Sequence, residues 1–462
     1  MRKLKLAVDF LPKSHELVIV GGGIDGAALL YVVSRYTDIK DVLLLEKYSD
    51  IATLNSNSRT NAQTLHVGDI ETNYTVEKAR EVKRAADYVL SYTRKELKAS
   101  ERARIIQACQ KMVLGVGSDE IESLERIYAS GIRSVFPSMR KLGRSEIARL
   151  EPNVVRGRNP RERIMALSSG NGYMVDFGRL ARTFVDKARK VHGKRIEVRF
   201  NDPVLDAKRG NEFYTLETKH GRLYSDFVAF EAGTYSLYFA KKFGYDRNIS
   251  ILAVGGGYYF SKRVLNGKVY RVQKGGIPFA AVHADPDITN DKVTRYGPTA
   301  TIELELEKDH PETAIDYIET FDLDMPTAET LENILLNRDI SRIIRTNMLY
   351  SIPVIGKRRF LENEARKIVP RLRYEDLWMG RHVGGIRPQI IDENRRKLVL
   401  GEAKLQREGL VFNITPSPGA TSCIASALED TLAIVKYLGK EFYADRFEED
   451  LGQVQIRRKV AR

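Results

Sequence analysis

The chain has 462 residues, 43% of them hydrophobic and 29% charged, which predicts two or three globular folding units and excludes a largely disordered chain. No apolar run approaches the roughly 18 residues that cross a bilayer, and the basic N-terminus lacks the apolar core of a signal peptide, so we expect a cytoplasmic protein. The net charge of +14 arises from scattered basic residues without a nucleic-acid-binding motif, so we expect no nucleic-acid partner but either a solvated basic surface or loose attachment to an anionic membrane face.

The first predicted elements are a strand, a glycine-rich turn, a helix and a second strand, in that order. Residues 16–20 are an apolar run rich in β-branched residues and predict a buried parallel strand. Gly21–Gly26 follow at once and match GxGxxG, residues 27–36 have helical character, and residues 41–45 predict a second strand that ends in Glu46. This order predicts a Rossmann-like dinucleotide-binding unit, whereas the glycines alone would also fit a structural turn.

The residues of this unit have expected roles in holding a dinucleotide. Gly21 permits the tight turn, Gly23 lets the backbone approach a diphosphate, and Gly26 allows the helix to pack closely on the strand. Gly22 lies between them, and the helix N-terminus turns its amide groups toward the anionic diphosphate. Glu46 follows Gly26 by twenty residues, where its carboxylate can accept hydrogen bonds from the adenosine ribose hydroxyls.

Later segments favour FAD over NAD as the dinucleotide. A polar stretch at 55–66 can wrap a large cofactor. Near the other end of the chain, a predicted strand at 410–414 leads through a turn of small residues at 415–422 into a helix at 424–438. The N-terminus of that helix suits the pyrimidine edge or the ribityl chain of a flavin. An NAD-dependent dehydrogenase stays an alternative, and it would be a colourless protein.

Motifs spread from residue 16 to residue 422 resemble those of one family. They are N-A-Q-T-L-H at 61–66, E-T-N-Y-T at 71–75, V-D-F-G at 175–178, K-V-Y at 268–270, G-x-P at 276–278, H-A-D at 283–285, G-P at 297–298, G-I-R-P-Q at 385–389 and S-P-G-A at 417–420. In this order they resemble the motifs of the malate:quinone oxidoreductases, FAD-dependent enzymes of the D-amino-acid-oxidase-like superfamily. Several of the motifs are shared with L-2-hydroxyglutarate dehydrogenase.

Two residues depart from the family pattern. Gln63 and Leu65 stand where the family usually has glycine. If those glycines let the backbone approach the flavin, the bulkier side chains would alter the pocket or its substrate. The departures leave open a flavin-bound subunit that binds or assembles without catalysis.

The resemblance implies an α/β fold in which an FAD-binding Rossmann-like domain is interleaved with a mixed-sheet α+β substrate domain. The FAD-binding domain would comprise residues 1–85, 165–245 and 375–462, and the substrate domain residues 86–164 and 246–374. The sequence is compatible with this division, because residues 76–100 and 312–350 are helical in pattern and residues 300–305 alternate like a half-buried strand.

The implied FAD site gathers residues from both ends of the chain. Beside the glycine turn and Glu46, it comprises Ser58, Asn61, Ala232, Gly233, Gly385, Pro418, Gly419, Ala420 and Thr421. Ala232 and Gly233 follow a predicted buried strand at 226–230. No metal site is expected, because Cys109 and Cys423 have no CxxC partner and are interpreted as core thiols.

Oxidation of a 2-hydroxy acid also needs a group that holds the substrate carboxylate. An arginine suits this role because its planar guanidinium binds a carboxylate through two parallel hydrogen bonds. Arg387 is the first candidate and Gln389 lies in the same motif. Arg295 is a candidate for a second carboxylate. A surface arginine in a structural ion pair is the alternative interpretation of Arg387.

The reaction further needs a base that takes the hydroxyl proton, and histidine titrates in the right range. Two of the seven histidines lie in family-like motifs. His283 is one candidate, with Asp285 as the partner that would stabilise its imidazolium. His66 is the other, and a role in the flavin pocket is the alternative for it.

The resemblance implies oxidation of (S)-malate to oxaloacetate, a reaction of the tricarboxylic acid cycle, with electrons passed to a membrane quinone. It also implies a protein peripheral on the inner face of the cell membrane. The alternative substrate is L-2-hydroxyglutarate or another small 2-hydroxy acid.

Overall fold

The first strand, helix and second strand form as the sequence predicts. The computed structural model describes residues 14–170, 172–245, 248–273, 281–321, 329, 332–333, 336, 338–399, 403–414 and 419–454. The described chain begins with β1 (His15–Val20). It continues through α1 (Ile24–Tyr36) into β2 (Asp41–Leu45). Strands β1 and β2 are parallel neighbours, so the chain crosses over through α1.

These strands lie in the centre of a sheet that has eight strands within the described residues. Its order is β21-β22-β11-β1-β2-β8, and the hairpin β9–β10 pairs with β11. Strands β22, β11, β1, β2 and β8 run parallel, and β21 is an antiparallel edge strand. The added strands are β8 (Arg195–Arg199), β9 (Val204–Arg209), β10 (Tyr214–Thr218), β11 (Gly221–Phe230), β21 (Ala403–Arg407) and β22 (Leu410–Ile414).

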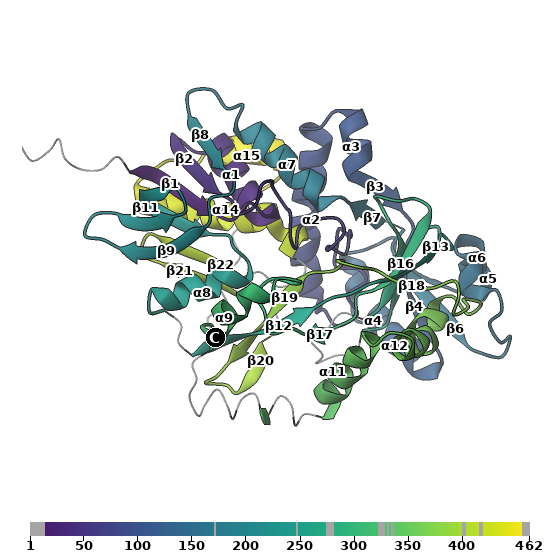
Figure 1. The fold of residues 1–462 in the computed structure, drawn as a ribbon. Helices are drawn as coiled ribbons and strands as arrows, with labels where there is room; N and C mark the ends of the chain where they lie inside the picture. Colours follow the sequence, from purple (N-terminus) through teal and green to yellow (C-terminus); the bar gives the residue numbers. More distant parts are fainter. Residues whose placement is uncertain are drawn as a thin grey trace, which may run out of the picture.

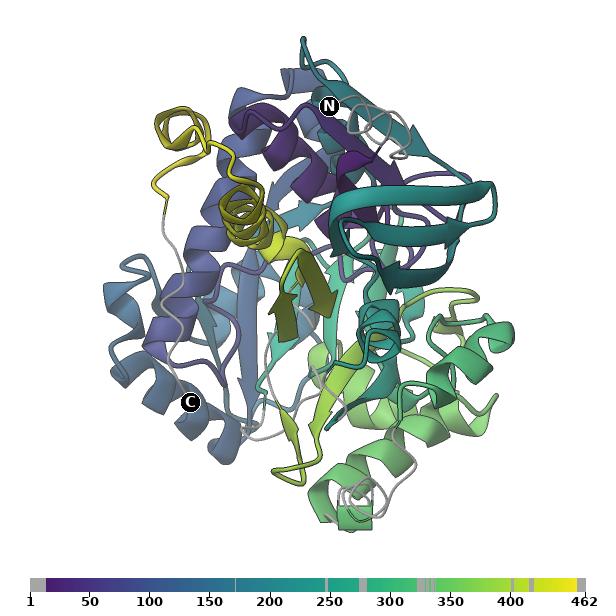
Figure 2. The ribbon, with the colours of Figure 1, turned by 90° about the vertical axis from the view of Figure 1, so that its left-hand side faces the viewer.

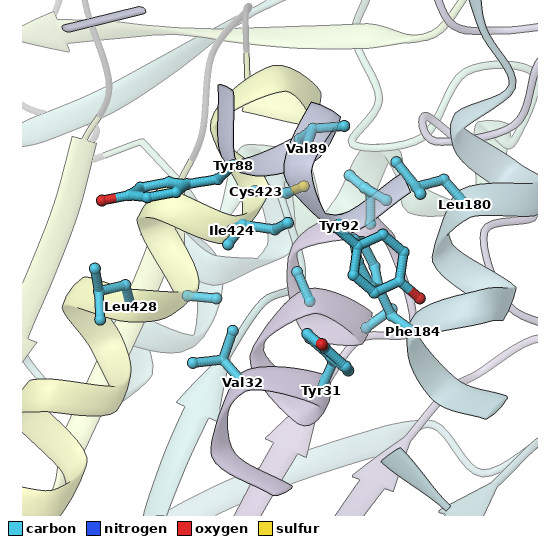
Figure 3. Packing of buried hydrophobic residues seen from close by; sticks show 14 of the residues in the cluster. Tyr31, Val32, Tyr88, Val89, Tyr92, Leu180, Phe184, Cys423, Ile424 and Leu428 are labelled. Atoms are coloured by element: carbon cyan, nitrogen blue, oxygen red, sulfur yellow. The ribbon is translucent and has the colours of Figure 1, made fainter. Parts of the chain in front are cut away.

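Both faces of this sheet are covered, and alternate residues of β1 show it. Leu17 and Ile19 pack into the cluster formed with α1, α2 (Val76–Lys95), α7 (Phe177–Ala188) and α14 (Gly419–Leu438). Val18 and Val20 pack on the other face, against β10, α8 (Thr234–Lys242) and β12 (Ile249–Gly255). Figure 3 shows the helical side, where rings and aliphatic side chains from these four helices interdigitate.

A second sheet of eight described strands lies on the opposite side of the molecule (Figure 1). Its order is β18-β13-β16-β15-β14-β4-β6-β5, with antiparallel pairs except the parallel pair β14–β4. The strands are β4 (Lys111–Val116), β5 (Arg140–Leu142), β6 (Ile164–Ser168), β13 (Tyr259–Lys262), β14 (Lys268–Arg271), β15 (His283–Pro286), β16 (Val293–Gly297) and β18 (Trp378–Met379). This mixed sheet agrees with the predicted α/β class.

Two smaller sheets join the large ones. An antiparallel sheet of order β17-β12-β19-β20 lies between them in Figure 1, and β3 (Ile106–Cys109) pairs with β7 (Gly172–Val175). In the four-stranded sheet, β12 is joined by β17 (Thr301–Ile302), β19 (Ile386–Asp392) and β20 (Lys397–Val399). The chain thus crosses between the sheets several times. The division into two domains at the stated boundaries stays a prediction.

The remaining helices cover the sheets from outside, as the two ribbon views show (Figures 1 and 2). They are α3 (Ala99–Ile105), α4 (Ser118–Ala129), α5 (Arg144–Leu150), α6 (Pro152–Val155), α9 (Ala314–Ile318), α11 (Arg338–Tyr350), α12 (Ile355–Phe360), α13 (Arg366–Ile368) and α15 (Ala444–Leu451). Short helical turns lie at Ile132–Ser134, Pro311–Thr313 and Leu361–Ala365.

The predicted strands at 16–20, 41–45, 226–230 and 410–414 are confirmed, the second and the last with the same bounds. The predicted strand at 300–305 is wrong for most of its length. Residues 301 and 302 form β17 and pair with β12, Glu303 N still donates to Ala253 O at 3.0 Å, and the chain then leaves the sheet in turns. The long helix expected at 76–100 ends at Lys95, and α3 begins as a separate helix.

Candidate active site

A cavity of about 500 Å³ opens at the carboxyl ends of the central parallel strands. The chain leaves β1 at Val20, β2 at Leu45 and β11 at Phe230, and residues that follow each strand line the cavity. Ligands of open α/β sheets bind at this edge, because parallel strands all end there. The lining comes from residues 20–21, 23–25, 45–48, 52–56, 60–62, 64, 66, 202–205, 231–235, 238–239, 307, 316, 385–388, 413 and 419–421.

The glycine turn is shaped by close backbone contacts. Gly21 has a φ of +112°, and a Cβ there would lie 2.5 Å from the carbonyl oxygen of Glu231. A Cβ at Gly26 would overlap the carbonyl oxygen of Gly21, so only glycine lets α1 start this close to β1. Gly23 precedes α1 and lines the cavity, and a Cβ there would meet only Ser56 Oγ, at 3.4 Å.

Glu46 lies at the end of β2 and also lines the cavity. Its Oε2 accepts a hydrogen bond from Gly22 N at 2.7 Å, and its Oε1 accepts one from Tyr48 N at 2.8 Å. Burial raises the pKa of Glu46, although these two backbone hydrogen bonds oppose the shift. The carboxyl group is therefore fixed beside the glycine turn with lone pairs left for hydroxyl donors.

Two serines of the polar stretch have different places in the structure. Ser56 Oγ accepts a hydrogen bond from Ile24 N at 3.0 Å and lines the cavity at the N-terminus of α1. Sequence reasoning missed Ser56 and chose Ser58. Ser58 is buried and donates to Asp176, which caps α7 by accepting from Arg179 N at 2.9 Å. Ser58 is not among the described residues that line the cavity, because it holds the start of α7.

Two further helix N-termini border the cavity. Gly419, Ala420 and Thr421, which the sequence assigns to the cofactor, line it at the start of α14, while Pro418 and Ser417 lie outside the described residues. Thr421 Oγ1 accepts a hydrogen bond from His66 N at 3.0 Å and thereby ties α14 to the 61–66 segment. Ala232 and Gly233, which the sequence also assigns to the cofactor, line the cavity before α8. Such ends attract anionic groups.

Glu231 is a lining residue that sequence reasoning missed. Its Oε2 accepts from Asn413 Nδ2 at 2.8 Å, while its Oε1 is buried without a hydrogen-bond partner in the described part of the chain. Burial, together with the charges of Asp430 and Asp25, raises the pKa of Glu231 well above its ordinary value. The sequence contains a signal that could have identified Glu231, because this residue directly follows a predicted buried strand, as Glu46 does.

These features fit the dinucleotide that the sequence predicts. The glycine turn leaves a cradle that a Cβ would fill, and Glu46 beside it can accept hydroxyl hydrogen bonds. Glu231 lines the same cavity, and its buried Oε1 has no hydrogen-bond partner among the described residues, so it suits a polar ligand atom.

The 61–66 segment alternates between the cavity and the protein interior. Asn61, Ala62, Thr64 and His66 line the cavity, while the two departures from the family pattern do not. Gln63 is buried, and its side-chain amide donates to Ser58 O at 2.9 Å and accepts from Ile288 N at 2.9 Å. Leu65 packs in the helical core, so the expectation that these two side chains alter the pocket is wrong.

His66 combines exposure to the cavity with a fixed orientation. Its Nδ1 is hydrogen-bonded to Glu71 Oε1, and the Glu71 side chain is only 9% exposed. Burial opposes ionisation of Glu71, but the hydrogen bond to His66 and the charges of His66 and Lys111 lower its pKa. An ionised Glu71 can only accept, so Nδ1 carries the proton and Nε2 of a neutral ring is left as an acceptor.

Arg387 presents a cation to the cavity. It lies on β19, half-buried, in register with Val254 and two residues after Gly385, which also lines the cavity. Within the described residues its guanidinium has no ion pair with an acid. The half-buried Lys308 lies near it, donating to Val383 O at 2.9 Å, and burial lowers the pKa of Lys308. Gln389 lies two residues further along β19 and is buried outside the described cavity lining.

The other predicted catalytic and substrate residues form a buried charge cluster behind the wall. Asp285 and Arg295 are cross-strand partners on β15 and β16, and Asp285 Oδ2 lies 3.0 Å from Arg295 Nη2 and 2.6 Å from Lys268 Nζ. Burial opposes ionisation of Asp285, but these two cations lower its pKa to about 2. Arg295 also donates to Asn61 O at 3.1 Å and Ala62 O at 2.8 Å, so it supports the wall from behind.

His283 belongs to this cluster and not to the described cavity lining. It pairs with Tyr270 in register, and their rings stack with centroids 4.5 Å apart. Burial lowers the pKa of His283 to about 3, although Asp285, whose Oδ1 lies 3.7 Å from Nε2, works against the shift. The structure therefore places His66 and Arg387 in the cavity lining and His283, Asp285 and Arg295 in the buried cluster, although the charge of His66 still contributes to the lowered pKa of His283.

The described part of the chain contains neither a metal-binding cluster nor a membrane-spanning helix. None of its clusters of His, Cys, Asp and Glu could hold a metal ion. None of its helices is both long and apolar enough to span a bilayer. Cys109 and Cys423 are free thiols, and burial raises the pKa of both.

Comparisons with known proteins agree with this site. The family model described as malate:quinone oxidoreductase (Mqo) matches residues 13–451. A probable malate:quinone oxidoreductase of Campylobacter jejuni is 38% identical over 95% of this chain and 99% of its own. The malate:quinone oxidoreductase of Helicobacter pylori is 37% identical over 96% of this chain and 98% of its own.

More distant relatives support the fold. The mitochondrial L-2-hydroxyglutarate dehydrogenase of Homo sapiens is 24% identical over 89% of this chain and 87% of its own. The structure of L-α-glycerophosphate oxidase from Mycoplasma pneumoniae with FAD bound aligns with a TM-score of 0.62 at 18% identity, covering 96% of this chain and 99% of that one. This likeness confirms the predicted fold class. From the match along nearly its whole length, the chain belongs to the malate:quinone oxidoreductase family.

Proposed function

We propose that the protein oxidises (S)-malate to oxaloacetate with FAD and passes the electrons to a membrane quinone. Membership of the malate:quinone oxidoreductase family supports this activity, and the predicted FAD is the cofactor of that family. The single observation that carries the proposal is that His66 and Arg387 line the same cavity as the glycine turn. A proton acceptor and a carboxylate-binding cation thus face the space next to a dinucleotide cradle.

The residues that would hold FAD are those that border the cavity at the sheet edge. The α1 N-terminus at Gly21–Gly26 would bind the diphosphate, Glu46 the adenosine ribose, and the α14 N-terminus at Gly419–Thr421 the flavin end. When bound, FAD supplies the hydride acceptor, because no amino-acid side chain can accept a hydride.

Arg387 would bind the substrate carboxylate. Its guanidinium has no competing acid among the described residues, so pairing with malate satisfies a half-buried cation. Lys308 adds a second positive charge nearby. Together they favour a dianionic acid such as malate over a monoanionic one.

His66 would take the hydroxyl proton at Nε2, and Glu71 would orient the ring from Nδ1. Glu71 also stabilises the imidazolium that forms, because its own pKa is lowered and it keeps its negative charge. His283 suits this role less, because a pKa of about 3 leaves its ring a weak base at neutral pH. The α14 contact through Thr421 fixes the backbone of His66.

The membrane quinone, the anionic membrane face and a position on the inner face of the cell membrane also stand as proposals. The family name supports the quinone, and the charge of +14 supports attraction to anionic lipid. Oxidation of malate would make the protein part of the tricarboxylic acid cycle.

The test is a substrate panel with a soluble dye as electron acceptor. The holoprotein is assayed with (S)-malate, (R)-malate, L-2-hydroxyglutarate and L-lactate. We expect (S)-malate to give the highest kcat/KM, by at least about tenfold, which corresponds to roughly 1.4 kcal/mol of transition-state binding. Preference for L-2-hydroxyglutarate would refute the malate assignment, and a bound flavin that no acid reduces would refute catalysis.

A further inference from the structure

An exposed apolar segment joins α11 to α12 at the edge of the molecule (Figures 1 and 2). Five large apolar side chains within eight residues are open to solvent. These side chains, called here the apolar tip, are Met348 (52% exposed), Leu349 (37%), Ile352 (43%), Val354 (66%) and Ile355 (56%). Single exposed apolar residues are common, but such a concentration marks a surface that contacts something else.

The apolar tip is held outward by a rigid base. Tyr350 and Phe360 flank it and are both buried, and Tyr350 O accepts a hydrogen bond from Tyr259 OH at 2.6 Å. Phe360 stacks on the ring of Tyr259 with centroids 4.4 Å apart. Between them Gly356 N donates to Ile352 O at 2.8 Å, and a Cβ at Gly356 would overlap the carbonyl oxygen of Leu349. The loop is therefore folded tightly with its apolar side chains pointing away from the core.

Basic residues surround the apolar tip. Residues 338–360 contain six Arg or Lys and one acid. Arg342 and Arg345 on α11 and Arg358 and Arg359 on α12 are exposed, and Lys357 lies over the ring of Tyr374 at 3.9 Å. Within the described part of the chain, none of these five cations forms an ion pair with an acidic side chain. The charges are therefore available to an anionic partner.

Apolar side chains flanked by unpaired cations fit the boundary between lipid headgroups and acyl chains. Apolar groups enter the acyl region while the cations pair with anionic headgroups, and stable attachment needs both contributions. A second copy of the chain fits less well, because a two-fold contact would bring the same cations together. We propose that residues 342–359 form the surface by which the protein docks on an anionic lipid bilayer. This proposal rests on the proposed function, whose quinone is dissolved in the membrane.

The proposal predicts two separable losses of vesicle binding. Holoprotein is floated with vesicles of phosphatidylglycerol and phosphatidylcholine at low salt. The Val354→Asp/Ile355→Asp variant should bind at least about thirtyfold more weakly, because charged side chains cannot enter the acyl region. The Arg358→Glu/Arg359→Glu variant should lose a similar factor, because each basic residue contributes about fivefold. Vesicles without phosphatidylglycerol, or added salt, should weaken wild-type vesicle binding as the Arg358→Glu/Arg359→Glu substitution does. Neither should reproduce the loss caused by Val354→Asp/Ile355→Asp.

Matched variants control for charge and for folding. Lys98→Glu/Arg104→Glu changes net charge equally at two exposed residues, one directly before α3 and one on it, far from α12 in Figure 1, and should bind vesicles like the wild type. Ile355→Leu keeps the tip apolar and should also bind normally. All variants should oxidise malate at the wild-type rate with a soluble dye acceptor, because the tip touches none of the described cavity lining.

The outcomes separate the two proposals. Wild-type vesicle binding by both tip variants would overturn the docking surface. So would a wild-type dimer that the tip variants convert to monomers without loss of vesicle binding. Absence of dye-coupled malate oxidation in the wild type would refute the proposed function, while the loss of vesicle binding by the tip variants would still identify the lipid-docking surface.

Discussion

Gln63 shows how one residue can depart from a family pattern and leave the site intact. Its φ of +52° lies in the left-handed region that favours glycine, which explains the glycine usual at this position. Hydrogen bonds to Ser58 O, Asp287 Oδ1 and Ile288 N hold the side chain in that conformation. The side chain thus bridges to the loop after β15 and stays out of the cavity.

At the same scale, Arg387→Met tests the substrate clamp. Loss of a charge-assisted, two-pronged hydrogen bond should lower kcat/KM for (S)-malate by roughly 10- to 100-fold, mainly through KM. Flavin content should stay unchanged. Steady-state kinetics with the dye acceptor measure the effect. Arg387→Lys keeps the positive charge but loses the two parallel hydrogen bonds of the guanidinium, so its kcat/KM should lie between those of the wild type and Arg387→Met. An unchanged KM in Arg387→Met would remove Arg387 from the site.

Replacement of Glu71 tests its role behind His66. Glu71→Gln should lower kcat with little change in KM, because the neutral amide no longer stabilises the imidazolium. His66→Gln should lower kcat further, by about 10² to 10⁴. The double variant should be no slower than His66→Gln, since Glu71 acts only through His66. Additive losses in the double variant would contradict this dependence.

The sequence could identify Arg387 and His66 only as members of motifs. The alternation of residues 61–66 assigns Ala62, Thr64 and His66 to one face, but no local pattern says which face meets the cavity. His283 and Asp285 show the same limit. Their spacing predicts a shared face, while the burial of that face depends on Lys268 and Arg295 from neighbouring strands.

At the scale of elements, the β1–α1 turn was predictable because its determinants are local. Gly21, Gly26 and Glu46 lie within one strand–helix–strand unit, and the structure gives each a steric or hydrogen-bonding reason. Ser56 and Glu231 were missed because they reach the turn from other segments.

A pair of glycine substitutions separates folding from cofactor binding at this turn. Gly26→Ala should destabilise the protein by about 1–3 kcal/mol or more, because its Cβ overlaps the backbone at Gly21. Gly23→Ala should fold, since its Cβ meets only Ser56 Oγ at 3.4 Å, yet bind FAD at least about tenfold more weakly. Thermal unfolding and FAD titration of the apoprotein measure the two effects. Full FAD affinity in Gly23→Ala would refute close approach of the diphosphate.

The strands β14, β15 and β16 carry a buried charge cluster that should make stability depend on pH. The pKa of His283 is lowered from 6.5 to about 3. Below pH 6.5 the unfolded chain therefore binds a proton that the folded protein does not, and stability falls as pH falls, by about 1.4 kcal/mol per pH unit from this group. Asp285, with a pKa of about 2, adds a loss of the same sign only below about pH 4.

His283→Phe should therefore flatten the acid side of the stability profile between pH 6.5 and 4.5. Urea midpoints across this range measure the slope, and His192→Phe at an exposed position is the control that should leave it unchanged. A slope in His283→Phe equal to that of the wild type would show that His283 is protonated in the folded protein.

At the scale of the whole molecule, the site exists because segments distant in sequence meet at one edge. Glu46 follows β2, His66 lies in the segment tied to α14, and Arg387 comes from the sheet that bridges the two large ones. Motif order predicted that these segments belong to one enzyme. It could not predict that Arg295 supports the wall while Arg387 lines it, because both are arginines in family-like motifs.

Anaerobic mixing of the yellow holoprotein with (S)-malate tests the central claim most directly. The visible absorbance of the flavin reports whether the acid held at Arg387 and deprotonated by His66 transfers its hydride. We predict rapid and complete bleaching in the wild type, and slowing by about 10² or more in His66→Gln with the flavin still bound. A protein that binds no flavin, or whose flavin stays oxidised in saturating (S)-malate, would contradict the account.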